Sequence, residues 1–197
     1  MLLDTAGALL ERQGYHATGV NQILSVSGLQ RGSLYHHFPG GKEELAVAAI
    51  LDRARRTERF VERHMAAWSD PAEAVQALVV ALADRVEHDA DGASPPFAAV
   101  TLEAGPGLER LRDACRLAYA GVRACFEAKL VASAHEPARA ASLAVVITAA
   151  IDGAFVLCRV DGDASPLRHV AKELAILLRR AQPEGTIATR ASATSSA

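Results

Sequence analysis

Aromatic residues and cysteine are scarce in this sequence of 197 residues. Aromatic residues make up only 5%, and few segments alternate apolar and polar residues with period two, so we expect helices and almost no strands. The three cysteines, Cys115, Cys125 and Cys158, are odd in number and lack CxxC spacing. This pattern favours a reducing compartment, the cytoplasm, over a disulfide framework, and we expect no metal site and no other cofactor.

The chain also lacks a positively charged leader and a convincing membrane span. Acidic and basic residues interrupt the apolar run at the N-terminus, so this segment predicts a first structural helix rather than a secretory signal. Residues 140–158 are apolar apart from Asp152 and approach the length of a membrane-spanning helix. We favour a buried helix of a soluble protein, because the segment is rich in alanine and an acid inside a span is costly.

A helix that is apolar on every side needs cover on every side, which a monomer of this size has trouble providing. A second subunit supplies that cover. The following segment, at about 166–181, presents a second apolar stripe, made of Leu167, Val170, Leu174, Leu177 and Leu178. We therefore expect a homodimer through the last two helices, which would form a four-helix bundle between the subunits.

Acidic residues are absent from residues 12–42, although the chain carries 23 of them and has a formal net charge of −2. This window holds Arg12, Arg31, Lys42 and several histidines, with no carboxylate among them. Because each neutralised phosphate releases condensed counterions, a short acid-free patch can bind DNA even in a slightly negative protein. The charge pattern indicates double-stranded DNA as a partner.

Helix signals follow one another along the chain. Gly14, Gly28 and the Pro39–Gly41 turn interrupt the apolar periodicity, and Thr18 is expected to cap the second helix. Mixed-sign charges at 52–59 are typical of a solvated strut within a long helix. We predict about nine helices, at approximately 2–13, 18–26, 30–38, 42–64, 71–88, 97–104, 108–132, 136–159 and 166–181.

These elements predict an all-α fold. Residues 1–45 would form a three-helix DNA-binding domain with a helix-turn-helix, and residues 46–181 a helical ligand-binding and dimerisation domain. Residues 182–197 contain too little apolar material to pack, so we expect a mobile tail there.

Two short helices around Gly28 match the helix-turn-helix plan, because glycine allows the tight reversal between them. Ile23 and Leu34, with Val26 and Leu29 beside the turn, are expected to pack the two helices crosswise. The second helix would then point its donors toward base edges and phosphates. These donors are Gln30, Arg31, Ser33, Tyr35 and His36, with Lys42 at the start of the next helix, where free backbone N–H groups favour a phosphate.

The sequence GSLYHHFPGGKEEL at 32–45, preceded by Thr18, Ile23 and Gly28, resembles the DNA-binding signature of the tetracycline-repressor (TetR) family. Its PGGK spelling resembles the branch typified by the lincomycin-resistance repressor. The resemblance implies an all-helical homodimeric repressor whose C-terminal domain binds a small hydrophobic effector and releases operator DNA. It also implies DNA contacts at Thr18, Gln30, Arg31, Ser33, Tyr35, His36 and Lys42.

Candidate ligand contacts lie in the C-terminal domain: Phe97, Thr101, Glu103, Tyr119, Phe126, Asp152 and Phe155. The four aromatic rings would form either a wall for a hydrophobic effector or ordinary core. Asp152 must be paired, hydrogen-bonded or protonated in its apolar helix, so it either stabilises a dimer contact or touches a ligand. Thr101 and Glu103 line the pocket or lie on a solvated face.

Two other function classes fit less well. A small helical enzyme would use Asp152 or Glu103 as its acid or base, but no nucleophile and base occur at recognisable spacing. The glycines before Lys42 do not form a phosphate loop, because Glu43 follows the lysine. A constitutive architectural DNA binder needs no pocket, which leaves the long second domain without a role. We therefore expect a regulator and not an enzyme.

Overall fold

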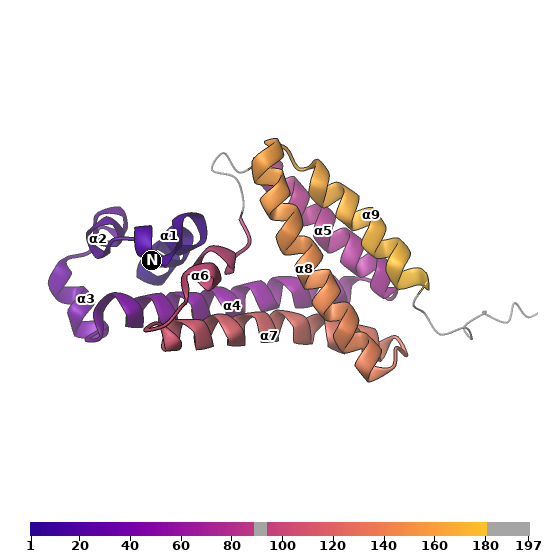
Figure 1. Ribbon diagram of the computed structural model, residues 1–197, viewed down its shortest axis with the longest axis horizontal. Coiled ribbons are helices and arrows are strands. Elements are labelled where there is room, and N and C mark those ends of the chain that lie inside the picture. The colour runs from indigo at the N-terminus through magenta and orange to yellow at the C-terminus, as the bar shows by residue number, and fades with distance from the viewer. Residues whose placement is uncertain (89–93, 181–197) are drawn as a thin grey trace, which may run out of the picture.

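The computed structural model describes residues 1–88 and 94–180, and no strand occurs within these two ranges. Nine helices make up this part of the chain, which confirms the all-α prediction (Figure 1). They are α1 (Leu2–Ala17), α2 (Val20–Ser27), α3 (Arg31–His37), α4 (Gly41–Ala67), α5 (Pro71–His88), α6 (Ala98–Glu103), α7 (Glu109–Ala132), α8 (Pro137–Asp161) and α9 (Ser165–Arg180).

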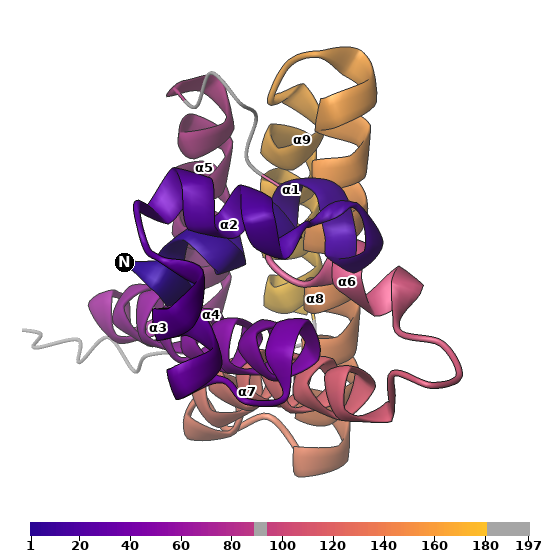
Figure 2. The same ribbon diagram turned by 90° about the vertical axis from the view of Figure 1, so that its left-hand side faces the viewer.

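The helices form a head and a body that share one long helix. Helices α1, α2 and α3 make the head at one end of the molecule, and α5, α8 and α9 pack together toward the other end (Figure 1). Helix α4 runs from the head into the body with α7 alongside it, and α6 lies against α1. Seen from the head end, α1, α2 and α3 stand in front of this body (Figure 2).

Helix α4 joins the two parts because its buried side chains serve both. Leu45, Ala49 and Ile50 are buried near its start, where α1 packs, and Val61 and Met65 are buried farther along, where α5 and α7 pack. One helix of 27 residues therefore belongs to both the head and the body.

Several helix ends follow the expected capping chemistry. The Asp70 carboxylate accepts a hydrogen bond from the Ala72 N–H at 2.9 Å, directly before Pro71 opens α5. Glu136 caps α8 by accepting from the N–H groups of Ala138 and Arg139, at 3.0 and 2.8 Å. Gly162 ends that helix in the left-handed conformation, with φ of 77°.

The first helix departs from the prediction at its C-terminal end. Gly14 breaks the helical dihedrals, with φ of 78° and ψ of −175°, but one further turn follows it and reaches Ala17. Thr18 does not cap α2, whose N-cap is Gly19. Instead, the Thr18 hydroxyl donates to the Gly14 carbonyl oxygen at 2.6 Å and so closes the end of α1.

The apolar stripe predicted for the last helix serves mainly the chain's own core. Leu167, Leu174 and Leu178 are buried within the subunit, where α9 packs against α5 and α8. The assignment of these three leucines to a dimer contact is therefore wrong. The predicted tail at 182–197 lies outside the described residues.

Helix α8 is, within the described residues, long and apolar enough to cross a membrane by length and composition. The core helix of a soluble protein passes the same test, and 39% of the most apolar window of α8 is buried inside the subunit.

Candidate functional sites in the head and in a cavity of the body

The helix-turn-helix is built on a small apolar contact. Ile23 of α2 and Leu34 of α3 are 2% and 1% exposed, and Gly28 between them has φ of 69°, the left-handed conformation that the tight turn needs. The Leu29 N–H donates to the Leu24 carbonyl oxygen at 3.2 Å and closes the reversal. Val26, expected in this contact, is 63% exposed, so that prediction is wrong.

The outer face of α3 gathers the predicted donors. Gln30, Arg31, Ser33, Tyr35 and His36 are all exposed. The Arg31 guanidinium donates to the Asn21 side-chain oxygen of α2 at 2.5 Å, which orients it along the surface of the head. Because residues 12–42 contain no carboxylate, this face offers donors without local negative charge.

Thr18 has a different role from the predicted one. Its side chain is fully buried, with 0% exposure, and its oxygen is engaged by Gly14 and by Gln13, whose Nε2 donates to it at 3.3 Å. A buried hydroxyl cannot reach a phosphate, so Thr18 shapes the connection between α1 and α2 rather than offering its side chain to DNA.

Lys42 lies between the head and α4 and is partly buried. Its Nζ donates to the His16 carbonyl oxygen at 3.4 Å and lies 4.3 Å from the centre of the Tyr15 ring, a cation–π contact. Burial lowers the pKa of Lys42, and the Glu103 carboxylate opposes that shift. Its ammonium therefore faces α1 in this conformation and would have to turn outward to bind a phosphate.

A cavity of about 250 Å³ lies in the body, open to solvent on one side, and is lined by side chains of α4, α5, α7 and α8, by Glu11 of α1 and by Ser94, Pro96 and Phe97. Five of the seven predicted ligand residues line it: Phe97, Tyr119, Phe126, Asp152 and Phe155. The structure therefore brings together residues from helices α7 and α8 and from the loop before α6, which lie far apart in the sequence.

Asp152 and Tyr119 form the polar contact of this cavity. The Tyr119 hydroxyl donates to the Asp152 carboxylate at 2.6 Å. Burial raises the pKa of Asp152, and the hydrogen bond from Tyr119 opposes that rise; burial also raises the pKa of Tyr119 itself. The Tyr119 ring meets Phe97 edge to face, with ring centres 5.6 Å apart. Asp152 thus faces the cavity, satisfied by a partner in its own subunit.

The other two predicted ligand residues, Thr101 and Glu103, do not line the cavity. Thr101 donates to the Phe97 carbonyl oxygen at 2.8 Å within α6. The Glu103 carboxylate accepts a hydrogen bond from the His16 N–H at 2.7 Å, beyond the break at Gly14. Glu103 therefore joins α6 to the head. The sequence did not indicate this contact, because Glu103 and His16 are 87 residues apart.

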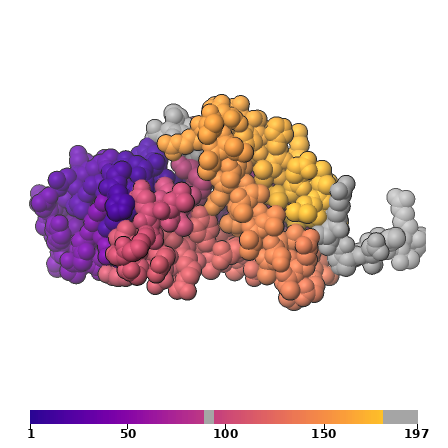
Figure 3. Space-filling view, viewed as in Figure 1, coloured from indigo at the N-terminus to yellow at the C-terminus, as the bar shows by residue number. Residues whose placement is uncertain are grey.

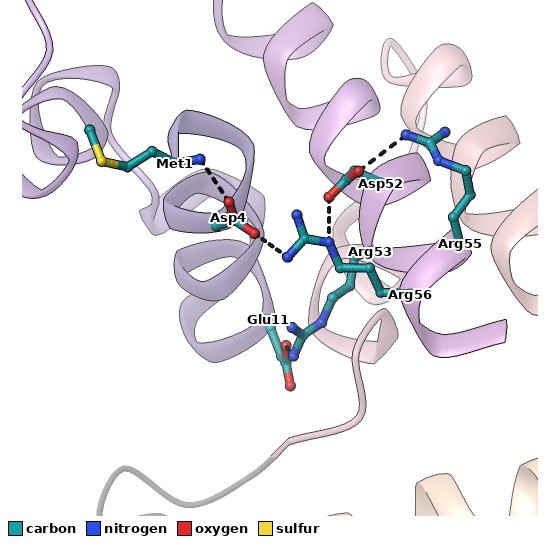
Figure 4. Close-up of polar contacts among 7 residues, drawn as sticks. All are labelled: Met1, Asp4, Glu11, Asp52, Arg53, Arg55 and Arg56. Carbon is teal, nitrogen blue, oxygen red and sulfur yellow. Dashed lines mark hydrogen bonds and ion pairs between the residues drawn. The ribbon is translucent and has the colours of Figure 1, made fainter. Parts of the chain in front are cut away.

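Four arginines of the cavity wall were also missed: Arg53, Arg56 and Arg63 of α4 and Arg85 of α5. The charges at 52–59 were predicted to form a solvated strut. Instead, Arg53 pairs with the buried Glu11 of α1, and Arg56 pairs with Asp4 of α1 and, at 2.9 Å, with Asp52 (Figure 4). Arg53 and Arg56 lie three residues apart on one side of α4, but Arg55 and Arg59 are four residues apart on the same helix, so residue spacing does not separate the two pairs.

Helix α8 leaves one continuous apolar stripe uncovered. Val145, Val146, Val156, Leu157 and Val160 are 46–76% exposed, and they recur at helical spacing along one face. The exposed Ala149 and Gly153 lie between them on the same face. In the space-filling view, α8 lies open on the near side of the body (Figure 3).

Comparison with protein-family models gives two matches. Residues 2–49 match the model described as bacterial regulatory proteins of the tetR family. Residues 71–173 match the C-terminal domain model described as transcriptional regulator LmrA/YxaF-like. Together the two models cover the head and most of the body.

Two curated relatives come from Bacillus subtilis strain 168. The chain is 34% identical to the HTH-type transcriptional regulator YxaF over 179 residues, which covers 91% of this chain and 94% of the relative. It is 35% identical to the HTH-type transcriptional regulator LmrA over 179 residues, which covers 91% of this chain and 95% of that relative.

Two solved structures share the fold at lower identity. The reduced form of Escherichia coli NemR superposes with a TM-score of 0.78 at 19% identity, covering 93% of this chain and 97% of that one. A TetR transcriptional regulator from Legionella pneumophila superposes with a TM-score of 0.77 at 20% identity, covering 89% of this chain and 94% of that one.

Proposed function

The chain belongs to the TetR family of bacterial transcriptional regulators, and from this membership we propose that it is a homodimeric repressor released from its operator by a small molecule. Members of this family are regulators, usually repressors, and not enzymes, which removes the alternative of a small helical enzyme.

The observation that carries the proposal is the outer face of α3. It presents Gln30, Arg31, Ser33, Tyr35 and His36 to solvent on a helix held by buried Leu34, and residues 12–42 contain no acid. A helix about 10–12 Å wide fits the major groove of B-DNA, where such donors meet base edges and phosphate oxygens. Arg31 and Gln30 lie at the start of α3, the part of a recognition helix that contacts bases.

The uncovered stripe of α8 supports the homodimer. Val156, Leu157 and Val160 alone expose three large apolar side chains on one helix face, and a second copy of the same face would cover them. Ala149 and Gly153 on this face let two helices approach closely. Two heads on one dimer would then reach two half-sites of one operator.

The cavity supports release by a ligand, because two sets of residues in its wall connect to the head. Glu11 and Arg53 both line it, and their ion pair fastens α1 to α4. Phe97, which also lines it, directly precedes α6, whose Glu103 accepts from the His16 N–H. A ligand that displaces the Glu11–Arg53 pair or Phe97 would shift the head. A coupling free energy of about 1–3 kcal/mol between the two sites suffices to weaken DNA binding. A constitutive architectural DNA binder has no use for such a cavity.

A selection of bound fragments from sheared genomic DNA would test DNA recognition and supply the operator. With that operator, Arg31→Ala should weaken binding by at least about tenfold, since a bidentate contact to a base contributes roughly 1–3 kcal/mol. Arg110→Ala, at an exposed arginine of α7, is the matched control and should bind as the parent does. Equal affinity of the Arg31→Ala variant and the parent would contradict the assigned recognition helix.

We further propose that the protein acts in the cytoplasm, where its DNA lies. The family is typically soluble and cytoplasmic, and α8, despite its apolar composition, packs against α7 and α9 as a body helix.

A further inference from the structure

A hydrogen bond joins the two helices of the helix-turn-helix on their solvent side. The Arg31 guanidinium, at the start of α3, donates to the Asn21 side chain of α2 at 2.5 Å. Arginine is only a donor, so the Asn21 atom that faces it is the amide oxygen. Within residues 1–88 and 94–180, the Arg31 side chain makes no other hydrogen bond and no ion pair. Asn21 is therefore the polar group that sets the direction of the Arg31 side chain.

The packing of the head does not depend on this contact. Asn21 and Arg31 are both exposed, and the buried side chains of Ile23 and Leu34 already hold α2 against α3. A hydrogen bond between exposed side chains adds little to stability, because water satisfies both groups almost as well. The contact therefore matters for the position of the guanidinium rather than for the fold.

The turn of α2 that carries Asn21 is itself tied to α1. The next residue, Gln22, exchanges two hydrogen bonds with Gln13 of α1: the Gln13 Nε2 donates to the Gln22 Oε1 at 2.8 Å, and the Gln22 Nε2 donates back at 3.4 Å. The Gln13 Nε2 also donates to the Ala17 carbonyl oxygen at 2.9 Å. Asn21 is short and lies on this restrained turn, so it can restrain the longer side chain of Arg31.

An amide is a suitable partner for an arginine that has to bind DNA. The amide oxygen accepts a hydrogen bond without neutralising the guanidinium, whereas a carboxylate would compete with phosphate and base edges for it. Residues 12–42 contain no acid, so Asn21 supplies an acceptor where the chain has no carboxylate. One bond to Asn21 also leaves the other guanidinium N–H groups free for a base edge.

We propose that Asn21 is a positioning residue for operator recognition, which holds the Arg31 guanidinium in its base-contacting direction before DNA binds. A long side chain loses rotamer freedom when it binds, and a side chain that is already restrained loses less. Random duplex DNA offers Arg31 no matching base, so this advantage applies to the operator. The inference rests on the proposed function, in which α3 is the recognition helix.

The test compares the affinities of the full-length protein for the selected operator and for random duplex DNA, measured by fluorescence anisotropy. Asn21→Ala should weaken operator binding by roughly three- to tenfold, the equivalent of ordering one long side chain, and leave binding of random DNA unchanged. Ser25→Ala, at an exposed residue one turn along the same face of α2, is the matched control and should bind both as the parent does. Equal losses for operator and random DNA, or no loss for either, would overturn the inference.

Asn21→Asp separates orientation from charge. Aspartate keeps an acceptor oxygen at the same position and adds a negative charge to the acid-free surface. This variant should bind both DNAs more weakly, because the carboxylate repels phosphate, and keep the parent's preference for the operator within about twofold. A preference lost as fully as in Asn21→Ala would show that the acceptor oxygen does not position Arg31.

A double variant assigns the effect to Arg31. In the Arg31→Ala background, Asn21→Ala should change neither affinity, because no guanidinium remains to be positioned. A further loss of operator binding there would contradict the assignment. Thermal unfolding of Asn21→Ala should match that of the parent. A melting temperature that falls together with operator affinity would make the role of Asn21 structural and would also overturn the inference.

The same titrations separate this inference from the proposed function. If Arg31→Ala weakens operator binding and Asn21→Ala does not, the recognition helix stands and the inference fails. A parent protein that binds neither DNA would remove both.

Discussion

At the scale of single residues, Gly14 shows how one position connects head and body. Its φ of 78° and ψ of −175° lie in a region that is essentially restricted to glycine. The Glu103 carboxylate also lies so close that a Cβ at residue 14 would overlap it. Glycine is thus required both for the break in α1 and for the approach of α6.

Gly14→Ala should therefore destabilise the protein, by roughly 1–3 kcal/mol from backbone strain, with the overlap adding to it. The free energy of unfolding in urea measures the effect. The double variant with Glu103→Ala should recover only the part that is due to overlap. As a control, Gly32→Ala in α3 meets no atom within 4 Å and has no positive φ, so it should be neutral or slightly stabilising. A Gly14→Ala variant as stable as the parent would refute this account.

Asp152 predicts a pH dependence of stability. Because burial raises its pKa, the folded state still holds a proton at pH values where the unfolded chain has released it. The stability that this group contributes is therefore lost as the pH rises from the ordinary pKa of about 4 in the unfolded chain through the raised pKa in the folded state. Asp152→Asn keeps a partner for Tyr119 and removes the titration.

The Asp152→Asn variant should accordingly have a larger free energy of unfolding than the parent at neutral pH. The difference should shrink as pH falls toward about 4, where both side chains are neutral. Urea titrations across this range measure it. Asp113→Asn, at an exposed acid of α7, provides the control. A difference that stays constant with pH would show that ionisation of Asp152 is not its cause.

Residues were predictable from the sequence where a local pattern determines their surroundings. Leu34 and the exposed donors of α3 follow from the helix-turn-helix spacing alone, and the structure leaves those donors in solvent. Thr18 and Glu103 were misplaced because their partners depend on tertiary contacts. The Thr18 hydroxyl closes α1, and Glu103 meets an N–H group freed by the break at Gly14.

At the scale of helices, α8 combines an inner face and an uncovered one. Its inner residues Leu143, Ala144 and Ile147 are at most 1% exposed, while Val156 and Leu157 on the other face are 55% and 53% exposed. Apolar composition all around the helix thus reflects two separate contacts, one within the subunit and one that we assign to a second copy.

Val156→Asp should abolish the dimer, because it would place a charge in the centre of an apolar contact. We expect the dimer dissociation constant to rise at least ~100-fold, about 2.7 kcal/mol, as measured by analytical ultracentrifugation. Leu117→Asp alters a side chain of α7 that is 59% exposed and lies outside the stripe, so it should leave the association unchanged. A Val156→Asp variant that remains dimeric would place the subunit contact elsewhere.

The helices themselves were largely predictable, since glycine, proline and capping acids mark most of their ends. The role of α4 was not predictable from the sequence. Its charges at 52–59 look like those of any solvated helix. Only the packing of α1 and the cavity against one face separates Arg53 and Arg56, which pair with α1 and line the cavity, from Arg55 and Arg59, which do neither. Sequence periodicity places these residues on a face but does not identify the element that faces them.

At the scale of the whole molecule, the proposed function depends on the distance between the two heads of a dimer. Helix α4 carries the head at one end and part of the cavity wall along its length, so in the proposed function a ligand and an operator would act on the same helix. By linkage, a ligand that weakens DNA binding is itself bound more weakly in the presence of DNA, by the same factor. The resemblance to a repressor family predicted this arrangement in outline, but the connections through Glu11 and Glu103 became visible only in the folded chain.

The most direct measurement is a titration of the purified protein against its selected operator and against random duplex DNA at several salt concentrations. We predict two subunits per operator and an affinity whose logarithm falls linearly with the logarithm of salt, by about 0.9 per phosphate neutralised. Arg31→Ala should lose the preference for the operator. Failure to form a salt-sensitive complex with either DNA would contradict the account that the acid-free head binds duplex DNA.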